Sequence, residues 1–439
     1  MKKVLMIFYS FAPQNNCAAI PNTKLVKYLD GEDVEITLIT NALLDDMEVD
    51  MSMLPDNVKK LRRFNVCRSK LFLSTVSAQR TKITKSGLKL KMKAEKRPFR
   101  AWCVSVLKYL YFELSGLDWY RAAMKMVREK LKDEVFDVVY SSYPSRETHL
   151  VARYLRDHGI AKKWIADFRD PMYYEEYDQG QCERLKRIQH RLEKAADHIT
   201  IVSEGAMEKF LFEDVPESKI TYIPNGFDPD DFDVSEISAK EGGDKLRIFY
   251  AGTLYSGRRD LSAMFRAFAE LAQAGTVDRN KVSFEYAGNE WPIFQVFAEK
   301  YGFAQQCTNY GFITRQRVME IMSEIDCSVV CTHNTSSDKG VVTGKVFELL
   351  LVGKPIIAIV GGDLPNSELG KIVRQCEAGV VYENGAAAED YPALKRWLEE
   401  KYKEKQNHGR ICSTVNTSER EKYSYKNIAH QLYELIEKI

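Results

Sequence analysis

The chain has 439 residues, of which 45% are apolar and 29% charged, and its formal net charge is +2. This length exceeds what one hydrophobic core usually supports, so we expect two domains, and the composition excludes bulk disorder. Nine cysteines without a C-x-x-C pair argue against a disulfide framework or a zinc ribbon. The sequence contains no run of about 18 uncharged apolar residues, so we predict no membrane span.

In the first half of the chain, short apolar runs alternate with amphipathic stretches, as in the βαβ units of a parallel sheet. The opening residues MKKVLMIFYSFAP imitate a signal peptide, but no small-x-small cleavage site follows, so we expect a buried strand there. Strands are expected in this half at 4–10, 34–40, 136–142, 163–168 and 198–203.

Residues 51–100 form a basic segment with fifteen Lys and Arg but only two acids, Asp56 and Glu95. Such blocks usually meet an anionic surface or stay solvated. No nucleic-acid-binding motif accompanies the segment, so we expect no nucleic-acid partner. A solvated insertion is the alternative. We favour an interfacial segment that binds an anionic membrane surface, because its bases are interleaved with apolar and aromatic side chains.

A second series of strands follows the turn-forming dipeptide Asn225-Gly226 and a polar stretch. These strands are expected at 246–252, 283–288, 327–332, 355–362 and 378–383. We place the domain boundary near 226–245. The pattern then predicts an α/β chain of two doubly wound domains, 1–225 and 246–410, that face a central cleft. A helical segment at 411–439 is expected to pack back toward the N-terminal domain.

Ligands bind beyond the carboxyl ends of the strands in sheets of this type, so the loops that follow strands are the candidate sites. One such loop begins at Gly252 and carries Arg258 and Arg259 ahead of a helical pattern. Helix N-termini favour anions, and the forked donors of arginine suit phosphate. The alternative is a solvated basic turn paired to Asp260.

A second loop follows the strand at 327–332 and leads into a helix that begins near Lys345. Gly340 and Gly344 allow close backbone approach to a ligand, and the helix start offers a positive end. Glu348 is expected in the first turn of this helix, where three roles are open to it. It could complement the helix dipole, pair with Lys345, or accept hydrogen bonds from the diol of a nucleotide ribose. Its place after a glycine-lined loop favours the ribose.

Two isolated residues are weaker candidates. His149 is a candidate for the acceptor side, but a lone histidine at a helix start is more often a surface or capping group. Glu204 follows the strand at 198–203 and is a candidate donor or acceptor contact. No carboxylate pair or histidine cluster has the spacing of metal ligands, so we expect no bound metal.

Seven stretches, in this order and spacing, resemble GT-B glycosyltransferases of the retaining family 4 type, particularly those that build bacterial cell-surface polysaccharides. They are FAP, WIADFRDPM, HITIVSEGAMEKF, ITYIPNGFDPDDF, YAGTLYSGRRD, YGFITRQRVMEIM and KVFELLLVGKPI. The resemblance implies the GT-B fold and transfer of a sugar, with retention, from a nucleotide sugar to a polyprenyl-linked or glycan acceptor. It further implies that the donor is a substrate and no other cofactor is needed. The enzyme would be cytoplasmic and peripheral at the inner face of the plasma membrane.

The resemblance also implies roles for particular residues. Glu348 matches the second glutamate of the E-x7-E signature, which binds the ribose, and Arg258 or Arg259 matches the basic residue that holds the diphosphate. The remaining donor-side residues are Lys345, Gly344, Thr343, Gly340, Gly252 and Glu204.

Two departures from the family pattern bear on the chemistry. Gly340 stands where the first signature glutamate is expected, which puts the donor-sugar contact in doubt. Arg169 and Asp170 stand where many relatives carry a histidine, and we take them as catalytic candidates. Two other functions stay open: a nucleotide-sugar epimerase of the same fold, and a non-catalytic module that binds nucleotide sugar or a partner enzyme.

Overall fold

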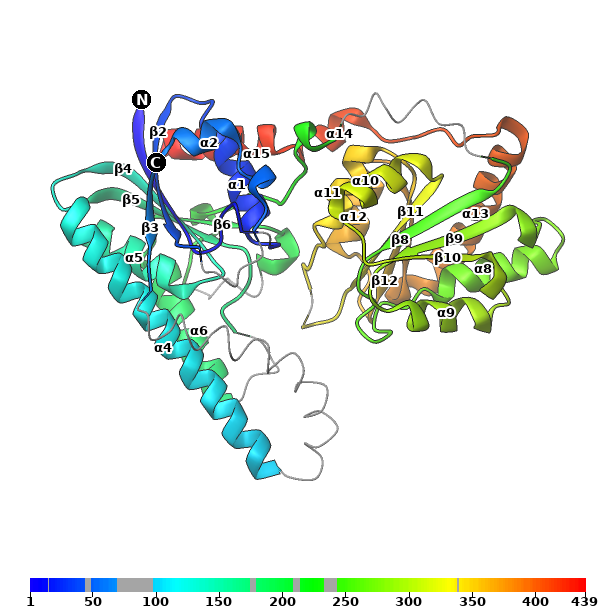
Figure 1. The fold of residues 1–439 in the computed structure, drawn as a ribbon, viewed down its shortest axis with the longest axis horizontal. Helices are drawn as coiled ribbons and strands as arrows, with labels where there is room; N and C mark the ends of the chain where they lie inside the picture. Colours follow the sequence, from blue (N-terminus) through cyan, green and yellow to red (C-terminus); the bar gives the residue numbers. More distant parts are fainter. Residues whose placement is uncertain are drawn as a thin grey trace. The chain divides into compact units, whose positions relative to one another are not determined.

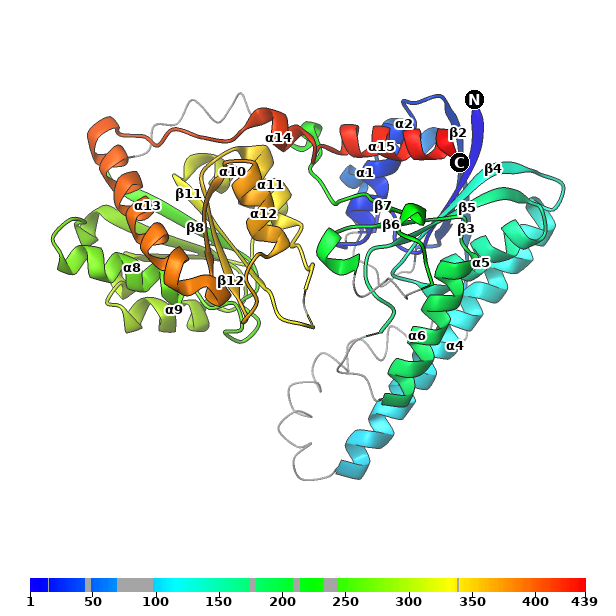
Figure 2. The ribbon, with the colours of Figure 1, turned by 180° about the vertical axis from the view of Figure 1, so that it is seen from behind.

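The computed structural model describes residues 1–14, 16–43, 49–68, 98–173, 179–207, 214–232, 243–337 and 339–439, with the backbone alone for 98–112 and 206. The chain divides into two compact units (Figures 1 and 2). Unit 1 comprises Met1–Val202, Lys209–Ile223 and Ala429–Ile439, and unit 2 comprises Ser203–Glu208 and Pro224–Ile428. Within the expected C-terminal segment, residues 411–428 therefore group with unit 2 and the last residues with unit 1.

Unit 1 is built on a seven-stranded sheet in the order β3-β2-β1-β4-β5-β6-β7, with every pairing parallel. All five strands expected in this half are present. Its strands are β1 (Lys2–Phe8), β2 (Val34–Asn41), β3 (Arg62–Val66), β4 (Phe136–Ser142), β5 (Ala161–Phe168), β6 (His198–Ile201) and β7 (Ile220–Tyr222). The two strands that the sequence did not predict, β3 and β7, form the edges of the sheet.

Helices flank this sheet, and the longest of them, α4 (Pro98–Lys130), runs beside α6 (Gln179–Ala195) in both views (Figures 1 and 2). Arg184 on α6 donates to Glu113 on α4 at 3.1 Å. The others are α1 (Ala19–Leu29), α2 (Asp56–Lys60), α5 (Arg146–Asp157) and α15 (Tyr425–Lys438). Within the described ranges, no helix has both the length and the apolar character needed to cross a membrane. Residues 69–97 of the basic segment lie outside the described residues.

Unit 2 is built on a six-stranded parallel sheet in the order β10-β9-β8-β11-β12-β13. All five strands expected in this half are present, and β10, at one edge, was not predicted. The strands are β8 (Leu246–Ala251), β9 (Val282–Ala287), β10 (Cys307–Gly311), β11 (Cys327–His333), β12 (Ile356–Gly361) and β13 (Gly379–Glu383).

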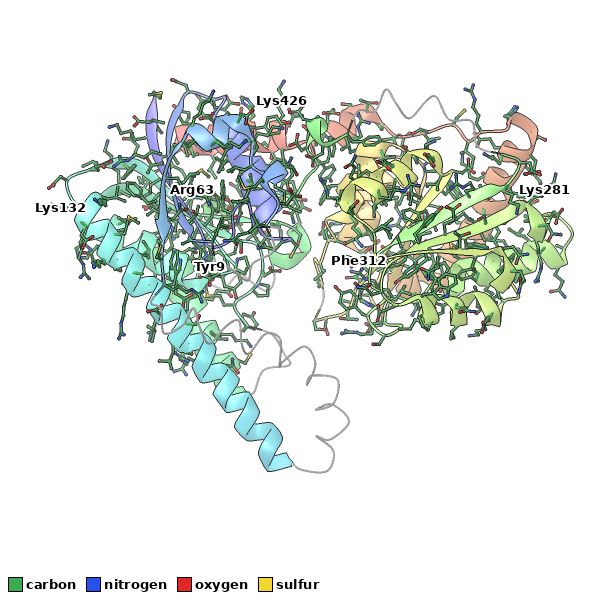
Figure 3. All side chains as sticks on the ribbon, in the orientation of Figure 1. Tyr9, Arg63, Lys132, Lys281, Phe312 and Lys426 are labelled. Carbon is green, nitrogen blue, oxygen red and sulfur yellow. The ribbon has the colours of Figure 1, made fainter. Side chains whose placement is uncertain are left out.

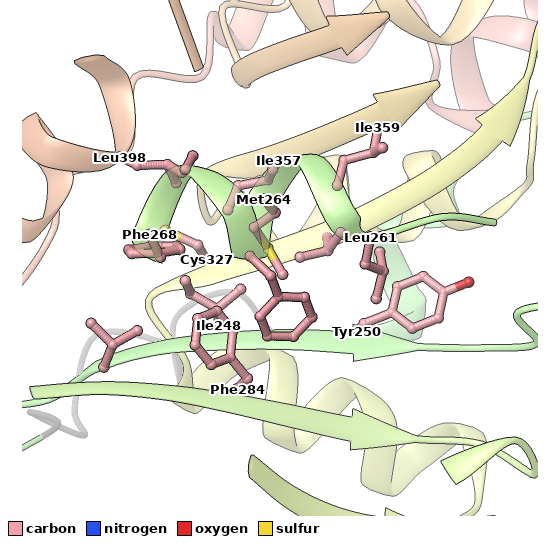
Figure 4. Packing of buried hydrophobic residues seen from close by; sticks show 14 of the residues in the cluster. Ile248, Tyr250, Leu261, Met264, Phe268, Phe284, Cys327, Ile357, Ile359 and Leu398 are labelled. Atoms are coloured by element: carbon pink, nitrogen blue, oxygen red, sulfur yellow. The ribbon is translucent and has the colours of Figure 1, made fainter. Parts of the chain in front are cut away.

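Two hydrophobic cores lie on the two faces of this second sheet. On one face, α8 (Ser262–Gln273), α9 (Trp291–Lys300) and α13 (Ala387–His408) cover the strands, and Figure 4 shows Phe268 and Leu398 of this layer over the sheet residue Ile357. The other face is covered by α10 (Arg315–Glu324), α11 (Lys345–Val352) and α12 (Glu368–Gln375), and a short helix, α14 (Thr417–Glu421), follows α13. Burial on both faces explains the nearly continuous apolar strand sequences.

Candidate functional site

The strand order of unit 2 reverses between β8 and β11, because the chain adds strands outward from β8 on one side and from β11 on the other. Ile248 pairs with Cys327 at this junction. In open parallel sheets the loops beyond such a point diverge and leave a crevice where ligands bind. Apart from Glu204, the predicted donor residues are on the two segments concerned, Gly252 to Arg259 after β8 and Gly340 to Glu348 after β11.

Lys345 connects these two loops. Its ammonium donates to the carbonyl oxygen of Ala251, the last residue of β8, at 2.5 Å. Gly252 leaves the space that the ammonium occupies, because a Cβ at this position would collide with Lys345 Nζ. Burial lowers the pKa of Lys345, and the nearby positive charge of Arg259 lowers it further. The junction therefore carries two cations, bonded to carbonyl oxygens two residues apart, Ala251 for Lys345 and Thr253 for Arg259, and an anionic ligand would relieve their repulsion.

Of the two arginines, Arg259 is the one beside Lys345. Its guanidinium donates to the carbonyl oxygen of Thr253 at 3.2 Å and lies 4.7 Å from the centre of the Tyr255 ring. Arg258 is exposed and lines a different cavity of about 390 Å³, beyond the ends of β11, β12 and β13. Among the residues predicted for the donor site, that cavity includes Arg258 alone. The structure thus separates two neighbours that the sequence could not distinguish.

The helix after the arginines begins later than the sequence indicated, and this corrects one expectation. Helix α8 starts at Ser262, whose N–H donates to the Asp260 carboxylate at 2.7 Å. Arg258 and Arg259 therefore lie in the preceding loop and not at the helix N-terminus. The N–H groups of this loop at residues 254–256 all donate to the carboxylate of Glu290. These three N–H groups are therefore not available to an anion, and the arginine side chains are the remaining candidates.

Glu348 lies in the first turn of α11, where the sequence placed it, but its partner is neither Lys345 nor the dipole alone. Arg315, at the start of α10, donates to Glu348 Oε1 at 2.8 Å and to Asp231 Oδ2 at 2.9 Å. Partial burial lowers the pKa of Arg315, but the two carboxylates outweigh it and raise the pKa. The side chain of Glu348 is 25% exposed, so it is fixed yet still accessible to a ligand.

The remaining donor-side residues surround the start of α11. Gly344 is its N-cap and has open space beside it, and Thr343 O accepts from the N–H of Val346 at 3.2 Å. Gly340 is buried with φ +81°. Its close neighbour in the structure is Gly205, where a Cβ would lie 3.0 Å from the Gly340 Cα.

Glu204 therefore comes near the loop that carries Gly340. The segment Ser203–Glu208 groups with unit 2, and the N–H of Gly205 donates to Glu368 Oε1 at 2.7 Å. Glu204 itself is exposed, and its carboxylate lies 3.7 Å from Lys371 Nζ. The segment thus places Gly205, the next residue after Glu204, against Gly340.

The candidates of unit 1 have different surroundings. Arg169 donates to Asp167 at 2.9 Å and is only 8% exposed, whereas Asp170 is exposed. His149 is fully buried, its Nδ1 lies 2.8 Å from Ser141 Oγ, and burial lowers its pKa to about 3. His149 is thus a neutral core residue, so the expectation of a surface or capping group is wrong for it, and the acceptor-side role stays a prediction.

One exposed aromatic residue near Glu348 was not predicted. Phe312 is 79% exposed and follows β10 on the loop that leads to Arg315 (Figure 3). A solvent-facing phenylalanine in a loop beyond a strand is a surface on which a planar ligand can stack. Within the described parts of the chain, no group of three or more His, Cys, Asp or Glu side chains could hold a metal ion.

Part of the sequence matches a known protein family. Residues 88–226 match the family model described as a glycosyl transferase 4-like domain. A comparison with curated protein sequences gave no significant match.

Solved structures similar to the chain share its two-sheet architecture. One is HepE from Anabaena, in complex with UDP and glucose, with a TM-score of 0.59, 14% identity and 100% coverage of both chains. The lipopolysaccharide outer core galactosyltransferase WaaB has a TM-score of 0.59, 12% identity and 100% coverage of both chains. The trehalose-6-phosphate synthase OtsA has a TM-score of 0.60 and 12% identity, over 100% of this chain and 99% of the other. The chain therefore has the GT-B fold of glycosyltransferases, as its sequence motifs indicated, and its residues 88–226 are similar to a glycosyl transferase 4-like domain.

Proposed function

We propose that the chain is a glycosyltransferase that moves a sugar from a nucleotide-sugar donor to a lipid-linked or glycan acceptor, with retention, in cell-surface polysaccharide synthesis. The observation that carries this proposal is the pair of cations, Lys345 and Arg259, at the junction of β8 and β11. The lysine ammonium is bonded to the end of β8 and occupies the space that Gly252 leaves open. A diphosphate would offset the positive charge of this pair and offer further oxygen acceptors to its donors.

The neighbouring residues fit the rest of a nucleotide. Glu348, oriented by Arg315, would accept hydrogen bonds from the ribose hydroxyls. Phe312, on the loop before Arg315, would stack on the base. Glu204, beside the loop of Gly340, would face the sugar. In this arrangement each part of the donor meets a residue type suited to it.

During transfer, the bond between the anomeric carbon and the diphosphate oxygen breaks, and the diphosphate leaves with the bonding electrons. The acceptor hydroxyl oxygen bonds to the anomeric carbon, and its proton passes to the leaving phosphate. Negative charge on the diphosphate grows along this path, so Arg259 and Lys345 stabilise the transition state more than the bound donor. This step needs no metal ion and no protein nucleophile.

Unit 1 would bind the acceptor. Asp170 is exposed directly after β5, where it can hydrogen-bond an acceptor hydroxyl, and Arg169 is held next to it by Asp167. We further propose that the basic segment 51–100 brings the enzyme to an anionic membrane surface at the cytoplasmic face, where a polyprenyl-linked acceptor would lie.

The proposal is tested by incubating the protein with UDP-sugars and GDP-sugars, with and without polyprenyl phosphate or glycan acceptors. Transfer to an acceptor is the expected result, and NMR of the new anomeric proton should show the configuration of the donor. An isomerised sugar formed without any acceptor would indicate an epimerase. Nucleotide binding without turnover over the whole panel would indicate a non-catalytic module.

A further inference from the structure

We propose that Glu290 is a positioning residue of the donor site, which holds the loop that carries Arg259 in the geometry needed to bind a diphosphate. The inference rests on the proposed function, because it takes the diphosphate as the ligand of Arg259. Glu290 is the N-cap residue of α9 and belongs to none of the motifs that indicated the site. Its role emerges only from its contacts.

The carboxylate of Glu290 accepts hydrogen bonds from three consecutive backbone N–H groups. Oε2 accepts from Leu254 at 2.5 Å and from Tyr255 at 2.9 Å, and Oε1 accepts from Ser256 at 2.9 Å. Successive N–H groups that converge in this way form a concavity for an anion. Here a side chain of the same unit fills it, so the concavity serves to hold the loop.

The loop needs such a partner because its backbone is strained. Tyr255 has φ +50° and Ser256 has φ +56°, and Gly257 continues with φ +88°. Residues with a side chain disfavour this left-handed region, since their Cβ approaches a backbone oxygen. Such conformations persist only where the surroundings enforce them, and they cluster at functional sites. Glu290 supplies this enforcement at both non-glycine positions.

Arg259 depends on the same loop residues. Its N–H donates to Leu254 O at 3.1 Å, its guanidinium donates to Thr253 O at 3.2 Å, and the Tyr255 ring lies 4.7 Å from the guanidinium carbon. Two of these three contacts come from residues that Glu290 binds directly. A change in the loop would therefore move the guanidinium away from Lys345.

Tyr286 links Glu290 to the first residue of the loop. Its hydroxyl donates to Gly252 O at 3.0 Å and accepts from the N–H of Glu290 at 3.0 Å. Gly288 makes room for this hydroxyl, because a Cβ there would collide with it. Glu290 thus connects the end of β9 to the loop after β8 that carries Arg259.

The test compares Glu290→Gln with the wild-type protein in binding of UDP and uridine, and of GDP and guanosine, by calorimetry. Glutamine has nearly the same shape but places an amide donor opposite a backbone donor. We expect at least a tenfold loss of affinity for the diphosphate and unchanged affinity for the nucleoside. Glu290→Asp keeps the negative charge on a shorter side chain, so its diphosphate affinity should lie between those of the wild type and Glu290→Gln. Glu299→Gln, on the exposed side of α9, is the matched control and should bind like the wild type.

The outcomes separate this inference from the proposed function. If Arg259→Ala loses diphosphate affinity and Glu290→Gln does not, the positioning role is refuted while the donor site stands. Equal losses for diphosphate and nucleoside would also refute it, since a general structural defect has that signature. If the wild-type protein binds neither diphosphate, the donor site itself is wrong. Should Glu290→Gln fail to fold, Glu290→Asp decides by the same comparison.

Discussion

Replacing Glu348 by glutamine is expected to weaken the binding of a nucleoside diphosphate about 10- to 150-fold. Arg315 holds Oε1 of this carboxylate at 2.8 Å, and within the described residues no hydrogen-bond donor is found for the second oxygen. A charge-assisted hydrogen bond from the second oxygen to a ribose hydroxyl contributes roughly 1.5 to 3 kcal/mol. About 1.4 kcal/mol corresponds to a tenfold change in affinity, which gives this range.

The same substitution should change stability only slightly. Arg315 keeps its bond to Asp231 at 2.9 Å, so no buried charge loses its last partner. An exposed ion pair contributes roughly 0.2 to 1 kcal/mol. For a domain of this size, such a loss lowers the melting temperature by about 4 °C at most. Binding and stability should therefore respond very differently.

Calorimetry with UDP and GDP, together with a thermal melt of each variant, checks both expectations. Glu320→Gln is the control, because Glu320 forms a similar exposed pair, at 2.8 Å from Arg317 on α10. The reasoning fails if Glu348→Gln binds the nucleotide normally and only its melting temperature falls. In that case Glu348 and Arg315 form a structural ion pair and the ribose lies elsewhere.

Three further predictions follow from the sites described above. Arg259→Ala should lower kcat more than acceptor affinity, whereas Arg258→Ala should have little effect on either. Steady-state kinetics of the two variants check this, and equal effects would mean that both arginines belong only to a solvated turn. Because burial and Arg259 depress the pKa of Lys345, and a diphosphate favours its charged form, UDP or GDP affinity should fall as pH rises through this lowered pKa. In Lys345→Met that pH dependence should vanish in calorimetric titrations. Finally, we expect the protein to sediment with anionic but not with zwitterionic vesicles. Salt should weaken this binding, and so should charge reversal at lysines 82, 85, 89, 91 and 93, which lie outside the described residues. Vesicle binding that does not respond to these changes would contradict the interfacial segment.

The sequence predicted the central strands and one edge strand, β13, and missed the other three edges. All ten expected strands are present, and the three additional strands, β3, β7 and β10, are outermost in their sheets. A central strand is buried on both faces and has a continuous apolar sequence, such as 355–362. The edge strand β7 is only partly buried along its length, and β10 carries exposed polar residues. The missed edge strands therefore lack the apolar pattern on which the prediction depends, whereas the edge strand β13 has it.

Partners in space were harder to predict than positions in the chain. Glu348 was expected in the first turn of a helix, and it is there, but the spacing suggested Lys345 as its partner. The lysine instead turns to Ala251 on another strand, and Arg315, 33 residues before Glu348, takes the carboxylate. Local spacing identifies neighbours on one helix, whereas these pairs form only after the sheet brings three loops together.

The loop of Arg259 shows most clearly what local pattern omits. A glycine-containing turn before a helix favours anion binding by backbone N–H groups, and this was the expectation. Tyr255 and Ser256 adopt left-handed conformations that no propensity predicts, and Glu290 takes up the N–H groups that would have held the anion. If the backbone held the diphosphate, removing the Arg259 side chain would leave most of the affinity. Since the N–H groups of residues 254–256 are already bonded to Glu290, side chains such as Arg259 should supply most of the affinity at this loop, and the loss caused by Arg259→Ala measures their contribution directly.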